Sequence, residues 1–259
     1  MTNGPNPLSA VWSMVSARRL SKPQPSGAGT ADHAALAAVL DRLRADGVRS
    51  LAGAATDLAA YRDDLSQIDP DDLTPRASLA LWLNLYNAGA LHRAGQAFSH
   101  ELDSVLRVPG AFSKPWATVS GESMSLDDIE HGKIRRFKDP RIHGALVCGA
   151  VSCPTLRSEP FTGEALDEQL DDQMRFFLRS GGADLDREGV TLRLTRVLKW
   201  YGGDFVRPHR MSTLIPATKS QIASAISPWL DPGVAERIAE SRPKIVFAPY
   251  DWSLDCSVG

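Results

Sequence analysis

The stretch TPRASLALWLNLYNAGA, from Thr74 to Ala90, is the segment that most directly indicates the fold. Thr74 can cap a helix with its side chain, and Pro75 suits the first helical position because its missing N–H would have no partner there. Apolar residues then recur at helical spacing on a wide face: Leu79, Trp82, Leu83, Tyr86 and Ala90. The stretch therefore predicts a long helix buried in the centre of the protein.

The segments on either side of this helix predict an α+β fold. Ser125-Leu126-Asp127-Asp128 resembles a capping box and starts a short helix. The apolar run Arg141–Cys148 has the length of a strand, although periodicity alone does not separate a strand from a buried helix. The other expected helices are 31–47, 51–65, 162–178 and 221–230, and the other expected strands are 117–120, 190–194 and 244–248. Helices come first and strands are scattered, so we expect a helical N-terminal half packed on a small, mostly antiparallel sheet.

The composition is that of an ordinary globular protein. The chain has 259 residues, a formal net charge of −2, 43% hydrophobic and 23% charged residues, which excludes disordered and fibrous classes. We expect a flexible N-terminal segment at 1–30, with a linker at Ser21–Thr30, and one domain over 31–259. A charge near zero argues against a nucleic-acid partner. No apolar stretch approaches the ~20 residues of a membrane span, and the N-terminus lacks a secretory pattern, so we expect a cytoplasmic protein.

The three cysteines, Cys148, Cys153 and Cys256, are too few and too odd in number for a disulfide scaffold. Cys153 is the sharpest candidate for chemistry, because it follows a turn of small residues and precedes Pro154. Such a turn can present a thiol to free backbone N–H groups, which stabilise a thiolate. The alternative is a buried thiol that acts as a small hydrophobic residue.

A cysteine nucleophile needs a base and a group that orients the base. His143 is the first candidate for the base and His131 the second, with Glu130 or Asn87 as the orienting group. His143 can equally be a core histidine, and Glu130-His131 an exposed helix end. If Arg141–Cys148 is a strand, His143 and the thiol of Cys148 point to opposite faces.

The remaining polar candidates have structural alternatives. Asn84 and Asn87 lie three residues apart on an apolar helix, and their amides either serve the site or hydrogen-bond loop backbone. The basic run at 133–138 is expected to be a solvated face, with an anion site as the alternative. Cys148 and Cys153 with two histidines would make a four-ligand zinc set, but the histidine spacing is unusual, so we expect no metal and no cofactor. Further candidates for a binding role are Asn84, Cys148, Arg141, Trp200 and Tyr201.

Several motifs in order give the chain a family resemblance. They are WLNLYNA at 82–88, SLDDIEHG at 125–132, DPRIHGALVCGA at 139–150, SCP at 152–154, LR at 156–157, WY at 200–201, DF at 204–205 and YDWSL at 250–254. Over roughly 77–254 the chain resembles the DUF547 family, a domain of unknown function found in bacteria and plants. Gly144 is a departure, since the family more often has a bulky aromatic residue there. It either opens space beside His143 or is filled by a neighbour.

The resemblance implies one site or one buried network that includes Asn84, Asn87, Glu130, His131, His143, Cys148 and Cys153. The family is similar to papain-like cysteine peptidases and transglutaminases, which implies a Cys-His site in a helix-plus-sheet fold. The histidines precede Cys153 here, so the papain-like arrangement would have to be permuted. We therefore expect a cysteine-dependent hydrolase or acyl or amide transferase with an unknown small-molecule or peptide substrate. The alternative is a non-catalytic binding or protein-interaction domain; the oligomeric state is not indicated.

Overall fold

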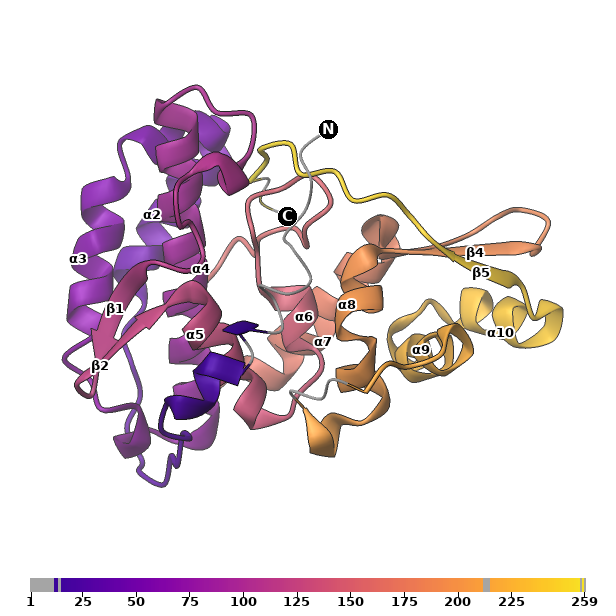
Figure 1. Ribbon diagram of the computed structural model, residues 1–259, viewed down its shortest axis with the longest axis horizontal. Helices are drawn as coiled ribbons and strands as arrows, with labels where there is room; N and C mark the ends of the chain where they lie inside the picture. The colour runs from indigo at the N-terminus through magenta and orange to yellow at the C-terminus, as the bar shows by residue number, and fades with distance from the viewer. Residues whose placement is uncertain (1–11, 14, 212–214, 257, 259) are drawn as a thin grey trace.

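The computed structural model describes residues 12, 13, 15–211, 215–256 and 258 (Figure 1). It is 56% helix and 11% strand, which confirms the α+β class. The helices are α2 (Ala34–Asp46), α3 (Ala55–Leu65), α4 (Pro75–Ser99), α5 (Leu126–Gly132), α6 (Ile142–Ala145), α7 (Leu166–Phe177), α8 (Arg196–Val206), α9 (Lys219–Ile226) and α10 (Pro232–Ser241). The strands are β1 (Pro115–Val119), β2 (Glu122–Ser125), β3 (Ala183–Leu185), β4 (Thr191–Leu194) and β5 (Lys244–Phe247).

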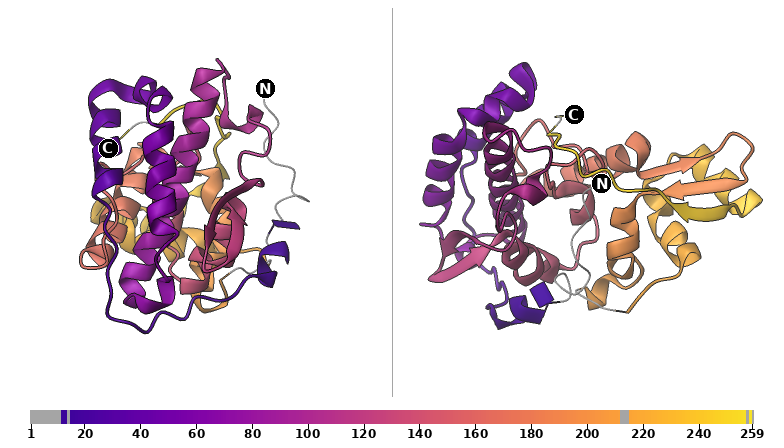
Figure 2. Two further views of the ribbon diagram at one scale, coloured as in Figure 1. Left: turned by 90° about the vertical axis from the view of Figure 1, so that its left-hand side faces the viewer. Right: turned by 45° about the horizontal axis from the view of Figure 1, so that its top comes forward.

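Helix α4 is the buried central helix that the sequence predicts. The Thr74 side chain accepts a hydrogen bond from the backbone N–H of Ala77, and Pro75 occupies the first turn. Every residue from Ala77 to Leu91 is buried, because α3, α5, α7 and several short helices pack against α4. Figure 2 shows α4 beside the neighbouring helices of the N-terminal half.

The hairpin of β1 and β2 leads directly into α5. The two strands pair antiparallel, and α5 begins with the expected capping box between Ser125 and Asp128. The helix ends at Gly132. This arrangement brings Glu130 and His131, at the end of α5, against the middle of the molecule.

The prediction of a strand over Arg141–Cys148 is wrong. Residues Ile142–Ala145 form one helical turn, α6, which packs against α7, and the chain becomes extended at Leu146. The run is apolar because both parts are buried, and burial on all sides removes the periodicity that separates a strand from a helix. His143 and Cys148 therefore do not lie on opposite faces of one strand.

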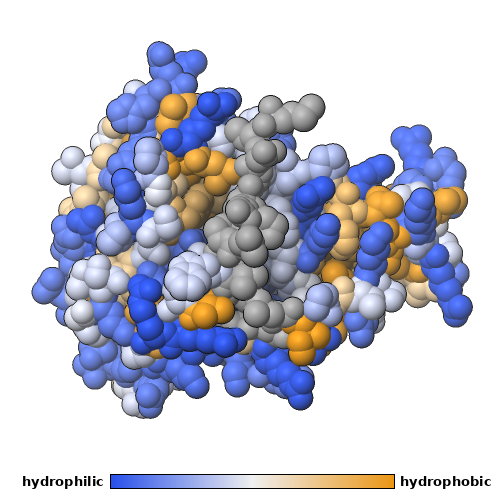
Figure 3. Space-filling model, in the orientation of Figure 1, coloured by the Kyte–Doolittle hydropathy of each residue, from blue (hydrophilic) through white to orange (hydrophobic). Residues whose placement is uncertain are grey.

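The residues after α7 build a second hydrophobic core, separate from the one around α4. Here β4 pairs antiparallel with β3 and parallel with β5, so this three-stranded sheet is mixed, whereas the β1–β2 sheet is antiparallel. After β5 the chain runs back toward α4, where Leu254 forms a bridge with Ala150 (Figure 1). The face in Figure 3 is mostly hydrophilic, with apolar residues showing on its right-hand part and at its upper left.

The N-terminal segment lies along the helical half. Residues 1–11 and 14 are outside the described part of the chain. Within the expected linker, Ser26 and Gly27 donate backbone hydrogen bonds to the carbonyl of Asp71, and Gly29 forms a bridge with Leu73. Among the described residues no helix is both long and apolar enough for a membrane span.

Candidate active site: a thiol pair beside a buried charged network

Two of the three cysteines meet at the end of the segment that follows α6. The sulfur atoms of Cys148 and Cys153 lie 2.7 Å apart, with the Cys153 thiol donating to Cys148. The backbone N–H of Cys148 donates to the sulfur of Cys153 at 2.7 Å. The hydroxyl of Tyr250, from the C-terminal segment, lies 3.2 Å from the Cys148 sulfur. Both cysteines are half-buried, so they form a compact thiol pair with a phenol beside it.

A tight turn between the cysteines brings the two sulfurs together. Gly149 has a φ of 75°, and a Cβ at this position would lie 2.8 Å from the Val105 side chain, so only glycine fits without strain. The Cys153 N–H donates to the carbonyl of Ala150 at 2.9 Å, which closes the turn. The C-terminal segment fixes it from outside, because Asp255 N–H donates to the carbonyl of Gly149.

Asn87 fixes the segment before the turn. Its amide Nδ2 donates to the carbonyl of Ala145 at 3.0 Å, and its Oδ1 accepts from the N–H of Val147 at 3.1 Å. Both polar ends of this buried side chain are thus used by backbone. Asn87 positions the chain that carries Cys148 and makes no hydrogen bond to a histidine in the described structure.

The surroundings of the two thiols shift their pKa values in opposite directions. The hydrogen bond from Cys153, together with the Tyr250 hydroxyl, holds the pKa of Cys148 below its usual range despite burial. Burial and the neighbouring Cys148 raise the pKa of Cys153. Of the two thiols, Cys148 is therefore the one that ionises more readily, and Cys153 is the donor that stabilises its thiolate.

His143 belongs to a second polar group, a buried charged network. Its Nε2 lies 2.9 Å from a carboxylate oxygen of Asp204 on α8. Arg135 donates to both oxygens of Asp204, at 2.8 and 3.0 Å, and lies 3.2 Å from Nδ1 of His131. Burial alone would raise the pKa of Asp204, but the hydrogen bond with His143 and the charge of Arg135 hold it below its usual range. Burial lowers the pKa of His131 to about 4, so this ring is neutral and accepts from Arg135.

Aromatic side chains connect the network to the thiol pair. The ring of Tyr201 stacks on His143 with centroids 4.0 Å apart, and the guanidinium of Arg135 lies 5.3 Å from the same ring. Tyr86 is buried near both groups: burial raises its pKa, and the nearby Glu130, Tyr201 and both cysteine sulfurs raise it further. The network and the thiol pair are therefore neighbours around Tyr86.

The structure brings most of the predicted site residues into these two groups, but not in the predicted pairs. In the described part of the chain, no hydrogen bond joins Cys153 to a histidine; Cys153 pairs with Cys148, and His143 with Asp204. Glu130 lies 3.5 Å from Nδ1 of His131, and both are buried rather than on an exposed helix end.

The other predicted residues have structural partners. The Asn84 amide donates to the carbonyl of Phe161 at 2.7 Å and accepts from its N–H at 3.0 Å. Its amide therefore hydrogen-bonds loop backbone, which is the structural alternative expected for it. Arg141 is shared among the carboxylates of Asp139, Asp167 and Asp171. Trp200 is 43% exposed and packs against Tyr250 and Trp252, outside the charged network.

Three important side chains were missed by sequence reasoning. The expectation of a solvated basic face over 133–138 is wrong for Arg135, which is 2% exposed, and for Lys133, which is 4% exposed. Arg135 lies 3.2 Å from Nδ1 of His131, but α5 ends at Gly132 between them, so helical spacing did not identify this contact. Asp204 follows Tyr201 by three residues on α8, so the two side chains share one side of that helix. Tyr250 could not be identified from local sequence, because it reaches Cys148 only where the C-terminal segment runs back to the turn.

Two further expectations are resolved by the contacts. Gly144 does not open space beside His143, because a Cβ there would lie 3.0 Å from the sulfur of Met174, so a neighbour fills the position. The zinc alternative does not assemble: among the described residues, no three His, Cys, Asp or Glu side chains are placed to share a metal ion.

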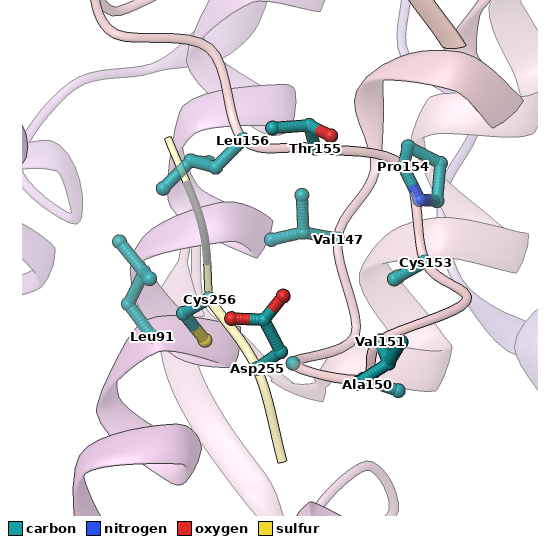
Figure 4. A pocket seen from close by; sticks show the side chains of 11 residues that line it. Leu91, Val147, Ala150, Val151, Cys153, Pro154, Thr155, Leu156, Asp255 and Cys256 are labelled. Carbon is teal, nitrogen blue, oxygen red and sulfur yellow. The ribbon is translucent and has the colours of Figure 1, made fainter. Parts of the chain in front are cut away.

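A small cavity adjoins the thiol pair (Figure 4). It is lined by the turn that carries Cys153, by Leu91 of α4 and by Asp255 and Cys256 of the C-terminal segment. Its volume of about 30 Å³ leaves room for about two water-sized molecules. Burial raises the pKa of Cys256 to about 12, so this third thiol stays protonated.

Comparison with known proteins supports the family resemblance over part of the chain. Residues 70–178 match the family model described as "Protein of unknown function, DUF547". No curated protein and no solved structure matches the chain. The matched region contains the thiol pair and Arg135, His131 and His143, while Asp204 and Tyr250 lie beyond it. Residues 70–178 of this chain are therefore similar to the DUF547 family, and later segments contribute Asp204 and Tyr250 to the polar centre.

Proposed function

We propose that the protein is a cysteine-dependent acyl-transfer enzyme, a hydrolase or a transferase, acting on an acyl group of a small molecule or peptide. The observation that carries the proposal is the pair of donors aimed at one sulfur. The Cys153 thiol at 2.7 Å and the Tyr250 hydroxyl at 3.2 Å both favour the thiolate of Cys148. A thiolate, not a thiol, is the nucleophilic form of cysteine.

The contacts favour Cys148 as the nucleophile, in place of the Cys153 expected from the sequence. The Cys148 thiolate attacks the acyl carbonyl, a carbon–sulfur bond forms, and the bond to the leaving group breaks. Cys153 stays protonated beside it and lines the cavity, so its thiol is placed to protonate the leaving group. Water then releases the acid, or a second nucleophile accepts the acyl group.

The charged network has a positioning role in this proposal. It joins the short helix Ile134–Phe137 after α5 to α6 and α8, because Arg135, His143 and Asp204 come from these three segments. His143 is thus expected to act through the arrangement of α6, from which the chain continues to Cys148. The cytoplasm is the compartment that fits, since the mechanism requires both thiols to be reduced.

The proposal is tested by trapping the acyl-enzyme. The full chain is incubated with p-nitrophenyl acetate and with a panel of longer esters and thioesters, and then digested with trypsin. Cys148 and Cys153 fall in one peptide, 142–157, and Cys256 in another, 245–259, because Arg141, Arg157 and Lys244 are the cleavage sites. We expect a thioester adduct on 142–157 in the wild type and in C153S, with none on 245–259.

The substitution C148S should remove the adduct and the release of p-nitrophenol together. Equal acylation of C148S and wild type, or acylation confined to Cys256, would exclude Cys148 as the nucleophile. Folding of each variant is checked by circular dichroism, so that loss of structure is distinguished from loss of the thiol.

The non-catalytic alternative is favoured by a different observation. The polar ends of Asn84, Asn87, Arg135 and Asp204 are all satisfied by partners within the protein, as in a network that serves the fold. If this is the whole role of the site, C148A and C153A will lower stability and no ester or thioester will form an adduct.

A further inference from the structure

The two sulfurs of the thiol pair are already close to bonding distance. They lie 2.7 Å apart, compared with about 2.04 Å in a covalent disulfide. The turn that carries them has its own closing hydrogen bond, and the C-terminal segment pins it at Gly149, Val151 and Ser152. The sulfurs are therefore held together by the backbone and need only a small approach to bond.

We propose that Cys148 and Cys153 form a site of reversible oxidation, in which a small hydroperoxide converts the two thiols to an intramolecular disulfide. This proposal does not rest on the acyl-transfer function, because it requires only the two thiols. Where acyl transfer also occurs, the disulfide removes its nucleophile.

The oxidation balances with the hydroperoxide as the only oxidant. The Cys148 thiolate attacks one oxygen of the peroxide, the O–O bond breaks, and Cys148 becomes a sulfenic acid. The departing alkoxide or hydroxide takes a proton and leaves as an alcohol or water. The Cys153 sulfur then attacks the Cys148 sulfur, the S–S bond forms, and the sulfenic hydroxyl leaves with the Cys153 proton as water. The net change is two thiols and one hydroperoxide to one disulfide, one alcohol or water, and one water.

The surroundings divide the two steps between the two cysteines. Cys148 is the better placed for the first attack, because the Cys153 thiol donates to its sulfur and the Tyr250 hydroxyl, 3.2 Å away, can donate to its thiolate. Cys153 lies beside it as the resolving thiol. The adjoining cavity of about 30 Å³, which Cys153 lines, accommodates a molecule of the size of hydrogen peroxide. Cys256 is buried and its pKa is raised, so it is expected to stay reduced.

The test uses the reduced, full-length chain and hydrogen peroxide. After exposure the remaining thiols are blocked with iodoacetamide, and the protein is digested with trypsin. Both cysteines of the pair fall in the peptide 142–157, so the disulfide appears as one peptide that is two hydrogens lighter and carries no alkyl group. We expect this peptide to replace the doubly alkylated one, dithiothreitol to restore both thiols, and the Cys256 peptide to remain alkylated throughout.

The variant C153S separates the two steps. Without the resolving thiol, oxidation should stop at the Cys148 sulfenic acid, which dimedone traps as an adduct on the same peptide. Full alkylation of 142–157 in the peroxide-treated wild type, a disulfide to Cys256, or sulfinic acid at Cys148 without a disulfide would each overturn the proposal. The wild-type result stands alone if C153S does not fold. Because the readout is peptide mass, failure of acyl transfer leaves it unaffected.

Discussion

Replacing Asp204 by asparagine should strongly destabilise the protein, because its carboxylate hydrogen-bonds both Arg135 and His143 in the buried network. Arg135 and Asp204 are 2% and 1% exposed, and two hydrogen bonds of 2.8 and 3.0 Å join them. Asp204→Asn leaves the guanidinium without its counter-charge in the interior. Removing one partner of a buried ion pair costs about 3–5 kcal/mol of unfolding free energy.

The assay is urea denaturation followed by tryptophan fluorescence, with Asp184→Asn as the matched control. Asp184 pairs with Arg193 at 3.3 Å, but these side chains are 62% and 53% exposed, so the control should lose less than about 1 kcal/mol. The double variant R135M/D204L removes both charges and should be less destabilised than D204N alone. A loss for D204N no larger than that of the control would refute this account of the network.

The difference in unfolding free energy between wild type and D204N should depend on pH in a defined direction. The pKa of Asp204 in the folded protein lies below its usual range, so its stabilising contribution is complete above the unfolded-state value of about 3.9. The contribution is lost as the pH falls through the folded-state pKa. The difference in stability between wild type and D204N should therefore be constant near neutral pH and shrink in acid.

Three other predictions concern the thiol pair and its supports. Tyr250→Phe removes a donor to the Cys148 sulfur; a hydrogen bond to a charged group contributes about 1.5–3 kcal/mol, so the pKa of Cys148 should rise by roughly 1–2 units in an alkylation titration. Gly149→Ala should lower stability by about 1–3 kcal/mol, because the φ of 75° is strained for alanine. The loss should exceed that of Gly121→Ala, whose φ is 78° but whose Cβ would meet open space, whereas the Cβ at Gly149 would meet the Val105 side chain. Urea denaturation can measure both. Burial, with the charge of Glu130, raises the pKa of Asp127 to about 7. The wild type should therefore lose stability relative to Asp127→Asn as the pH rises from about 4 to 7, which thermal denaturation can measure. The same pH dependence of stability in both proteins would contradict this.

The helical half of the fold could be predicted because its signals are local. Thr74-Pro75 and the apolar face behind them specify α4, and Ser125 with Asp128 specifies the start of α5. Arg141–Cys148 could not be assigned in the same way, since a segment buried on every side shows no periodicity of either kind. The parallel pairing of β4 with β5 depends on contacts between distant segments, which the sequence pattern does not specify.

The sequence indicated which residues belong to the site better than it indicated which of them contact each other. Cys148, Cys153 and His143 lie close in sequence and belong to adjacent groups in the structure. The pairing depends on residues that come from far along the chain: Asp204 lies 61 positions after His143, and Tyr250 lies 102 after Cys148. No local pattern near the cysteines indicates these partners.

The central claim is that Cys148 holds a thiolate stabilised by Cys153, and the most direct measurement is the pH dependence of iodoacetamide alkylation on peptide 142–157. In the wild type, alkylation of Cys148 should reach half its maximal rate below the ordinary cysteine pKa of about 8.5. In C153A, where Cys148 is the only thiol of the peptide, the midpoint should move upward because a donor is lost while the burial remains. A Cys148 that titrates at or above 8.5 in the wild type, with no shift in C153A, would contradict the account.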